Sequence, residues 1–385
     1  MADVIVRELY KRFGNVVAVN HINFDVKDME FVVLLGPSGC GKTTTLRMIA
    51  GLETPDGGQV QIGGRDVTYL APRDRNIGMV FERYALYPHL SVFENISYPL
   101  RVRKWHEQKV RERVHEIAEM LRITELIGRK VNQLSGGQMQ RVAIGRAIIR
   151  EASVFLLDEP ISHLDAKLRS HMRGELKRLQ KEIQSTTILV THDQLEAMSM
   201  GDRIAVLNQG VIQQFDTPDR IFNLPANLFV ANFVGEPGMN FLGCTLKREG
   251  EALRLEAPGL RVTVEEAWLK SSQAAINGGR AELVMGIRPE HVKLHSDRAG
   301  GGHSQYGEGK VYVVEPLGSE VIYDVEIGNK IVRIKVTEQE AKRLAVGMGD
   351  RVFVEFPSDS IYLFDKETEK TIAQAGFAHH EEKHQ

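Results

Sequence analysis

Short apolar runs alternate with longer amphipathic stretches over the first 235 residues of the chain. Two stretches between the runs, Val110 to Leu121 and Leu168 to Ile183, repeat apolar residues at helical spacing. The runs themselves are bounded by polar residues or glycine, as buried strands are: FVVLL (31–35), VFLLD (154–158), TILVT (187–191) and RIAVL (203–207). Because strands that alternate with helices build α/β domains, we expect one over residues 1–235.

The pattern changes after residue 235. Short segments of alternating apolar and polar residues follow one another, separated by glycine and charged turns, as in AELVMGIR (281–288), GKVYVVEPL (309–317) and RVFVEF (351–356). Repeated short strands predict a small β-barrel or sandwich, which we assign to residues 236–372. Residues 373–385 have little to bury, so we expect a disordered tail there.

Composition limits the class of protein. A chain of 385 residues, 42% of them hydrophobic, is long enough for two or three domains. Its formal net charge of −2 provides no general attraction for nucleic acid or anionic lipid. No stretch approaches the roughly 18 apolar residues of a membrane span, and the first residues lack the layout of a secretory signal. We therefore expect a cytosolic protein, in which Cys40 and Cys244 form no disulfide.

A phosphate-binding loop follows the first of these strands. The stretch GPSGCGKTT (36–44) fits the pattern G-x-x-x-x-G-K-[ST], and a helical pattern comes directly after it. In this context glycines let backbone N–H groups surround phosphate oxygens at a helix N-terminus. We expect Lys42 to reach the β- and γ-phosphates and the Thr43 hydroxyl to bind Mg²⁺. The candidate nucleotide ligands in the loop are Gly36, Ser38, Gly39, Cys40, Gly41, Lys42, Thr43 and Thr44.

Two acids end the strand at 154–158. Asp158 is suited to hold Mg²⁺, directly or through water, and Glu159 to orient or deprotonate an attacking water. Alone, such a pair usually marks a solvated turn. Downstream of a phosphate loop, the catalytic interpretation is favoured.

The stretch LSGGQ (134–138) makes the assignment specific, because it is the signature of the ATP-binding cassette family. The chain resembles that family over residues 1 to about 235. The resemblance implies an α/β P-loop NTPase cassette with a helical subdomain at about 85–150, and an ATPase that uses ATP and Mg²⁺.

Other family motifs occur in the family's order. Ser162 to Asp165 match the D-loop, and His192 matches the switch histidine, which in the family touches the γ-phosphate. Phe13 stands where an aromatic ring usually stacks on adenine. The resemblance thus implies that Glu159, His192 and Lys42 are catalytic, with Phe13 and Asp165 also at the nucleotide.

The signature predicts a second anion-binding surface. Small residues at the start of a helix expose backbone N–H groups, and the residues concerned are Ser135, Gly136, Gly137 and Gln138. In the family this surface and the phosphate loop lie at opposite ends of a head-to-tail dimer. Each ATP would therefore contact Lys42 of one copy and Ser135 and Gly137 of the other, so that ATP closes a two-fold homodimer.

The chain has one uninterrupted cassette and no membrane span, which resembles the ATPase subunit of bacterial importers. MGIRPEHVKL (285–294) and later strands resemble the OB-fold-like, tandem-barrel regulatory domain of maltose-importer ATPases. The resemblance implies two separate permease subunits, an external solute-binding protein acting through them, and a peripheral location on the cytoplasmic face of the inner membrane. A sugar or sugar derivative is the expected cargo.

Alternatives stay open at this point. Related importers carry glycerol phosphate, polyamines or inorganic ions, and a soluble ATP-gated regulatory or scaffold protein is a candidate of another class. Nucleic-acid binding by the barrel, which fold analogy suggests, is not expected, because the strands lack a basic aromatic surface.

The stretch YALYPHLSVFENI (84–96) places several aromatics in a proline-containing loop. In the family this region accepts a short helix of the permease. The residues expected to line that apolar groove are Tyr84, Leu86, Tyr87, Pro88 and Leu90.

Two positions depart from the family. Glu82 stands where glutamine is usual, so it keeps an oxygen for Mg²⁺ but loses both amide donors. Its charge beside a triphosphate acts on a scale of about 4 kcal/mol. We expect Glu82 to join Thr43 and Asp158 as a Mg²⁺ ligand but to slow hydrolysis with ATP binding retained; a tolerated substitution is the alternative. His163 replaces a commoner asparagine near the expected dimer interface, and we expect it to be structural.

Overall fold

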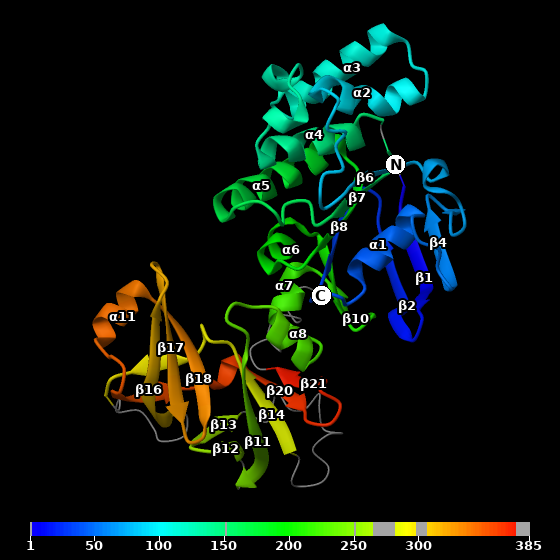
Figure 1. Cartoon of the computed structure of the whole chain (residues 1–385). Coiled ribbons are helices and arrows are strands. Elements are labelled where there is room, and N and C mark those ends of the chain that lie inside the picture. Colours follow the sequence, from blue (N-terminus) through cyan, green and yellow to red (C-terminus); the bar gives the residue numbers. More distant parts are fainter. Residues whose placement is uncertain (1, 151, 250–251, 265–281, 298–305, 375–385) are drawn as a thin grey trace, which may run out of the picture. The chain divides into compact units, whose positions relative to one another are not determined.

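The computed structural model describes residues 2–150, 152–249, 252–264, 282–297 and 306–374 (Figure 1). Contacts divide the chain into two compact units, Met1–Ile221 and Phe222–Gln385. Residues 375–385 of the expected tail lie outside the described ranges, whereas residues 373 and 374 belong to a strand and not to a tail. Within the described residues, no helix combines the length and apolar character needed to cross a membrane.

The first unit is built on a six-stranded sheet in the order β10-β9-β3-β8-β7-β6. Its strands are β3 (Phe31–Leu35), β6 (Ile77–Val80), β7 (Val154–Asp158), β8 (Thr186–Thr191), β9 (Arg203–Asn208) and β10 (Val211–Asp216). The strands β9, β3, β8, β7 and β6 are parallel, and β10 pairs antiparallel at the edge. Every residue of β3, β7 and β8 is buried, as expected for parallel strands covered on both faces.

A second sheet of the unit, in the order β2-β1-β4-β5, was missed by the sequence patterns. It contains β1 (Val4–Phe13), β2 (Val16–Val26), β4 (Gly57–Ile62) and β5 (Arg65–Asp66). Register shifts interrupt the pairing of β1 with β2 between Val6 and Leu9 and again before Lys11. Because each irregularity moves the buried side chains out of a strict period of two, the alternation that marks a strand is lost.

Helices cover the sheets of the first unit. They are α1 (Lys42–Ala50), α2 (Val92–Val102), α3 (Glu107–Met120), α4 (Gly136–Ile148), α5 (Ala166–Ile183) and α6 (Gln194–Met200). The helix α1 shares one hydrophobic core with both sheets. The helices α2, α3 and α4 pack on one another and form the cyan and teal part of Figure 1. These three lie within residues 85–150, where a helical subdomain is expected.

The second unit contains two antiparallel sheets that share a large hydrophobic core. The first sheet has the order β13-β12-β11-β14-β20-β21, with strands β11 (Asn240–Glu249), β12 (Ala252–Ala257), β13 (Leu260–Val264), β14 (Glu282–Ile287), β20 (Ile361–Asp365) and β21 (Thr371–Gln374). The second has the order β15-β19-β16-β17-β18, with strands β15 (Lys293–His295), β16 (Tyr306–Pro316), β17 (Glu320–Ile327), β18 (Lys330–Thr337) and β19 (Arg351–Glu355). The helix α11 (Glu338–Leu344) follows β18.

The contact boundary between Ile221 and Phe222 precedes the boundary near residue 235 that the sequence pattern suggested. It falls within α7 (Pro218–Asn223), and α8 (Leu228–Phe233) comes after it. The segment after α7 pairs with the strand region of the second unit: Leu228 N–H donates to Glu369 O at 2.9 Å and Thr371 N–H to Ala226 O at 3.1 Å. These backbone bonds explain why residues 222–235 cluster with the strands of the second unit.

Arg288, within the motif MGIRPEHVKL, is a fully buried cation that fastens this segment. Its guanidinium donates to Phe222 O at 2.6 Å, Val234 O at 2.5 Å and Ala231 O at 3.3 Å. It also lies 3.9 Å from the centroid of the Phe222 ring. Burial lowers the pKa of Arg288. One side chain therefore satisfies several carbonyl groups that would otherwise be buried without donors.

We predict that Arg288→Met destabilises the second unit by about 2–4 kcal/mol, because the three carbonyls lose their donors. Arg288→Lys should recover only part of the loss, since an ammonium group lacks the planar fork. Scanning calorimetry of the full chain measures the change, with Arg343→Met, an exposed arginine of the same unit, as the matched control. Equal shifts for the two methionine variants would contradict the role assigned to Arg288.

Candidate functional site

The parallel strands bring several loops to one edge of the central sheet. Pairing places neighbouring strand ends side by side: Leu35 opposite Thr191, Asp158 opposite Val190, and Val80 opposite Leu157. Because parallel strands end on the same side, the loops that follow β3, β6, β7 and β8 meet there. Those loops carry the phosphate-loop residues, Glu82, Glu159 and His192.

The loop between β3 and α1 closes tightly around the Lys42 side chain. Gly41 has φ 105°, and a Cβ there would lie 2.3 Å from Ala18 O, so only glycine fits. Lys42 Nζ is buried and donates to Gly36 O at 2.8 Å and Pro37 O at 2.9 Å. Cys40 is buried and free, as is Cys244. The loop thus presents an ammonium group and a helix N-terminus together, an arrangement that attracts phosphate.

Asp158 and Thr43 face each other from β7 and α1. The Thr43 hydroxyl donates to Asp158 Oδ1 at 3.3 Å. Burial raises the pKa of Asp158, the Thr43 hydrogen bond opposes that rise, and the charges of Glu159 and Glu82 add to it. A hydroxyl and carboxylates are hard oxygen ligands of the kind Mg²⁺ uses together with substrate phosphates. The chemistry of this donor set therefore fits Mg²⁺.

Glu159 and His192 form a pair at the same edge. His192 Nδ1 lies 2.9 Å from Glu159 Oε2. Glu159 has φ 45°, an uncommon left-handed conformation for a glutamate, and its N–H donates to Val190 O at 3.0 Å. The bond to β8 thus fixes the Glu159 backbone, and the imidazole contacts its carboxylate. This arrangement suits a group that must hold or accept a proton from water.

Glu82 engages His163, a contact that sequence patterns did not predict. Glu82 Oε1 lies 3.2 Å from His163 Nε2, and both side chains are 48% exposed. The structure therefore brings Thr43 and Asp158 together, with Glu82 close enough to influence Asp158 electrostatically. The only sequence signal for the pair is that both residues depart from the family pattern.

The signature residues begin α4. Ser135 is its N-cap and forms a capping box with Gln138, since the Gln138 N–H donates to Ser135 Oγ at 3.4 Å and the Ser135 N–H to Gln138 Oε1 at 3.0 Å. A Cβ at Gly136 would lie 3.2 Å from Leu164, and one at Gly137 would lie 3.0 Å from Leu168. The two glycines therefore allow α4 to approach the start of α5 closely.

Asp165 and Phe13 lie at the ends of two elements, before α5 and at the end of β1. Asp165 is the N-cap of α5 and accepts a hydrogen bond from Leu168 N at 2.9 Å. Phe13 ends β1 with 48% of its surface exposed, and Lys11 Nζ lies 5.1 Å from its ring centroid. Their expected nucleotide contacts stay predictions.

Arg146 near the end of α4 holds the loop that carries Glu82. Tyr84 and Ala85 have φ 58° and 49°. The Arg146 guanidinium donates to Ala85 O at 2.7 Å and Tyr84 O at 3.1 Å, and lies 5.5 Å from the Tyr87 ring centroid. Sequence reasoning missed Arg146, because neither residue with left-handed backbone is the glycine or asparagine that would mark such a turn.

Asn95 of α2 fixes the aromatic loop from the other side. Its Oδ1 accepts from Tyr87 N at 2.8 Å, and its Nδ2 donates to Tyr87 O at 3.1 Å and to Leu90 O at 3.3 Å. The Tyr87 ring lies 4.8 Å from that of Tyr98, which is exposed. The expected groove residues are thus held in a fixed loop, with Tyr84, Leu86, Tyr87 and Leu90 partly buried and Pro88 exposed.

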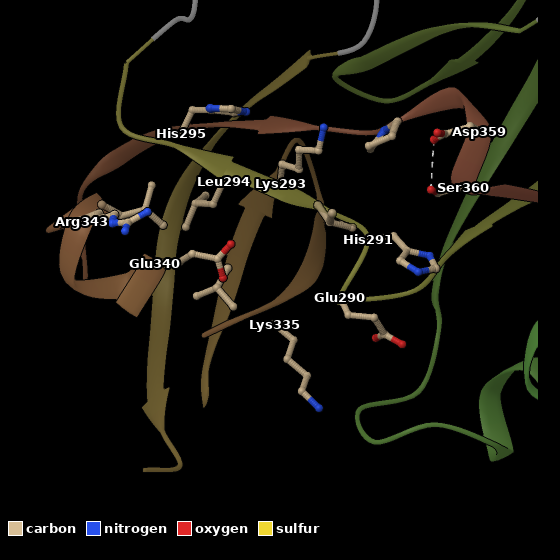
Figure 2. A pocket seen from close by; sticks show the side chains of 14 residues that line it. Glu290, His291, Lys293, Leu294, His295, Lys335, Glu340, Arg343, Asp359 and Ser360 are labelled. Carbon is tan, nitrogen blue, oxygen red and sulfur yellow. Dashed lines mark hydrogen bonds between the residues drawn. The ribbon is translucent and has the colours of Figure 1, made fainter. Parts of the chain in front are cut away.

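A cavity of about 560 Å³ lies in the second unit beside β15 and α11 (Figure 2). Its lining includes three basic residues, Lys293, Lys335 and Arg343, and three acidic ones, Glu290, Glu340 and Asp359. Several of these charges are already paired, since Lys293 lies 3.4 Å from Glu355 and Lys335 lies 2.9 Å from Glu320. This balance gives the cavity no net attraction for a polyanion.

Glu196 supports the turn that carries His192. It is buried in α6 and accepts a hydrogen bond from Thr191 Oγ1 at 2.7 Å, and that same hydroxyl accepts from Asp193 N at 3.0 Å. Burial raises the pKa of Glu196 from 4.5 to about 7, with the Thr191 hydrogen bond opposing the rise. The folded chain therefore binds this proton more tightly than the unfolded chain does.

We predict that this proton makes stability depend on pH. Its contribution is fully present below about pH 4.5 and is lost as pH rises through 7, a loss on the order of 3 kcal/mol. Glu196→Gln, which stays neutral, should match the native chain at pH 5 and be more stable at pH 8. Thermal unfolding at the two pH values tests this, with the exposed Glu119→Gln as control. A native chain as stable as the variant at pH 8 would refute it.

Comparisons with known families match three parts of the chain. The family described as "ABC transporter" matches residues 19–162. The family described as "MalK OB fold domain" matches residues 235–292, and that described as "TOBE domain" matches residues 285–364.

Individual relatives match almost the whole chain. The trehalose/maltose import ATP-binding protein MalK of Thermococcus litoralis is 47% identical over 97% of this chain and 100% of its own length. The xylose/arabinose import ATP-binding protein XacK of Haloferax volcanii is 46% identical over 92% of this chain and 90% of its own. The sn-glycerol-3-phosphate import ATP-binding protein UgpC of Ruegeria pomeroyi is 43% identical over 97% and 100%.

Solved structures resemble the first unit. A dimeric bacterial ABC transporter cassette aligns with a TM-score of 0.51 and 33% identity, covering 56% of this chain and 98% of that one. A post-hydrolysis dimer of a cassette bound to ADP and Pi aligns with a TM-score of 0.50 and 34% identity, again over 56% and 98%.

Proposed function

The chain belongs to the ATP-binding cassette family of transport ATPases, as its signature predicted, and on that basis we propose that it powers an importer by hydrolysing ATP. The predicted fold, a P-loop cassette followed by an OB-fold-like domain, is confirmed as well. One observation carries the proposal: the phosphate loop, the Thr43–Asp158 contact and the Glu159–His192 pair meet at one edge of a parallel sheet.

We propose that the triphosphate of ATP occupies the loop around Lys42. The ammonium group supplies charge, and the backbone N–H groups at the start of α1 supply donors. The remaining expected ligands, Gly36, Ser38, Gly39, Cys40, Gly41, Thr43 and Thr44, form this loop and the first turn of α1. Phe13 is the proposed platform for adenine.

Thr43, Asp158 and Glu82 are the residues that would hold Mg²⁺. Bound there, the ion would neutralise part of the phosphate charge. The Thr43 hydroxyl donates a hydrogen bond to Asp158, and burial raises the pKa of Asp158. A cation bound beside this carboxyl group would favour its charged form.

Glu159 is the proposed general base and His192 its partner. The carboxylate would accept or orient a proton of the attacking water, and the imidazole 2.9 Å away would fix the carboxylate and reach the γ-phosphate. The left-handed backbone of Glu159 supports this role, because strained conformations of that kind cluster at functional sites.

A second copy of the chain completes each site in this proposal. The start of α4 offers Ser135, Gly136, Gly137 and Gln138 with their backbone donors, and Asp165 starts the neighbouring helix. A two-fold dimer would set these residues against the nucleotide held by Lys42 of the other copy. The similar solved cassette is dimeric, which supports the pairing of two copies.

The fixed aromatic loop after Glu82 is the proposed docking groove for a permease subunit, so that the two copies of a dimer would hold two permease subunits. The lining residues of the groove are Tyr84, Leu86, Tyr87, Pro88 and Leu90. Docking there would hold the chain at the cytoplasmic face of the membrane, with an external solute-binding protein acting through the permease. Relatives named for sugars support a sugar or sugar derivative as cargo, and one named for glycerol phosphate keeps that alternative open.

We predict that Glu159→Gln lowers the Mg²⁺-dependent ATPase rate by about 10²–10⁴-fold while ATP binding is retained, because the variant keeps the shape but not the basicity. Turnover measured beside ATP affinity checks this. Glu82→Gln serves as the comparison: we expect it to raise turnover, since a neutral amide removes negative charge from beside the phosphates. Unchanged turnover in Glu159→Gln would contradict the assigned base, and unchanged turnover in Glu82→Gln would make Glu82 a tolerated ligand.

We also predict that the tagged chain, captured from detergent-solubilised membranes of its own organism, brings two integral membrane proteins with it. Tyr87→Ala should lose them, because the ring that lines the groove is removed. Tyr69→Ala, an exposed tyrosine outside the groove, is the matched control, and melting temperatures exclude misfolding. Capture of no membrane protein by the native chain would favour the soluble ATP-gated scaffold.

A further inference from the structure

Three carboxylates share the edge of the central sheet, and each meets a different donor. The Thr43 hydroxyl donates to Asp158, the His192 ring contacts Glu159 at 2.9 Å, and the His163 ring contacts Glu82 at 3.2 Å. Like charges this close repel one another, so the position of each carboxylate depends on its donor. The first two pairs belong to the chemistry proposed above, whereas the third has no assigned role.

His163 is presented by a rigid loop. The loop joins β7 to α5, and its apolar residues Ile161 and Leu164 are buried. Ser162 Oγ donates to Glu159 O at 3.0 Å, and Leu164 N donates to Ile161 O at 3.2 Å. The loop that carries Glu159 therefore also fixes the backbone of His163, while the imidazole itself stays half exposed.

Glu82 comes from a different loop, which is restrained mainly through its backbone. Tyr84 N donates to Phe81 O at 3.0 Å, and Arg146 holds the carbonyls of Tyr84 and Ala85. These bonds leave the Glu82 side chain free to rotate. A half-exposed glutamate loses about 1.5–2 kcal/mol of rotamer entropy when it is ordered. In the described part of the chain, the close contact of its Oε1 with His163 Nε2 at 3.2 Å is the one that restrains this side chain.

The shortest contact of the pair joins His163 Nε2 to one oxygen of the Glu82 carboxylate, Oε1, at 3.2 Å. A carboxylate held by one oxygen can offer the other to a cation, as ligands fixed by outer partners do.

We propose that His163 is a positioning residue that holds Glu82 Oε1 and so aims the second oxygen of that carboxylate at the Mg²⁺ of the bound nucleotide. The inference rests on the proposed function, in which Glu82 is a ligand of that ion. It assigns a role to His163 beyond the structural one expected from sequence. It also joins Glu82 and His163, the two residues that depart from the family pattern, in one function.

The test compares Mn²⁺ binding, followed by electron paramagnetic resonance with a non-hydrolysable ATP analogue, among variants of the full chain. His163→Ala should weaken Mn²⁺ binding about ten-fold, the lower end of the range for losing an outer partner. His163→Gln, whose amide can donate from about the same place, should restore most of it. In the Glu82→Gln background, removal of the imidazole should change binding less than about two-fold, since the carboxylate is absent.

His171→Ala, another exposed histidine of the same unit, is the matched control and should bind like the native chain. Native Mn²⁺ affinity in His163→Ala, or an equal loss with and without the Glu82→Gln change, would overturn the positioning role while leaving the proposed function intact. Failure of the native chain to bind Mn²⁺ with the nucleotide analogue would overturn the proposed function and this inference together.

Discussion

Parallel pairing of β3, β8, β7 and β6 is the constraint on which the proposed chemistry depends. Each of these strands is short, and its hydrogen bonds fix it in register with its neighbours. The side chains that follow the strand ends are therefore placed by the backbone, with no need for long connecting elements. A shift of one residue in any of these pairings would move Asp158 or its neighbours to the opposite face of the sheet. The same backbone hydrogen bonds thus bury the apolar strands and bring the proposed catalytic residues together at one edge of the sheet.

Sequence patterns predicted those features that depend on neighbouring residues. The buried strands, the phosphate loop and the acids after β7 all follow from local spacing, and each occurs where it was expected. Features that join distant segments could not be predicted in that way. The Glu82–His163 contact links two loops, and Arg146 holds a turn whose left-handed φ angles are not marked by glycine. The bulged strand β1 was missed because its irregular register hides the alternation.

The two units satisfy their buried polar groups by different means. In the first, carboxylates at the sheet edge take donors from hydroxyl and imidazole groups, which leaves them free to exchange those donors for a ligand. In the second, the buried Arg288 guanidinium donates to backbone carbonyls that are themselves fixed. The tendency of buried polar groups to find partners therefore gives an adaptable edge in one unit and a fixed clamp in the other. The contact boundary at Ile221–Phe222 lies before residue 235 because Arg288 attaches to the second unit a segment that the sequence pattern assigned to the preceding domain.

The helix α4 begins at Gly136 and reaches Arg146 about 15 Å further along its axis. A helix of this length bends little, so its two ends move as one body. Its first residues are the ones proposed to meet the nucleotide of a second copy, and Arg146 holds the loop of Glu82 and the aromatic groove. Because the helix is rigid, a tilt at its start would shift the loop that Arg146 holds near its other end. Binding of a second copy at the start of α4 would then move the Glu82 loop beside the chain's own nucleotide and, with it, the aromatic groove. This movement would need no change of secondary structure.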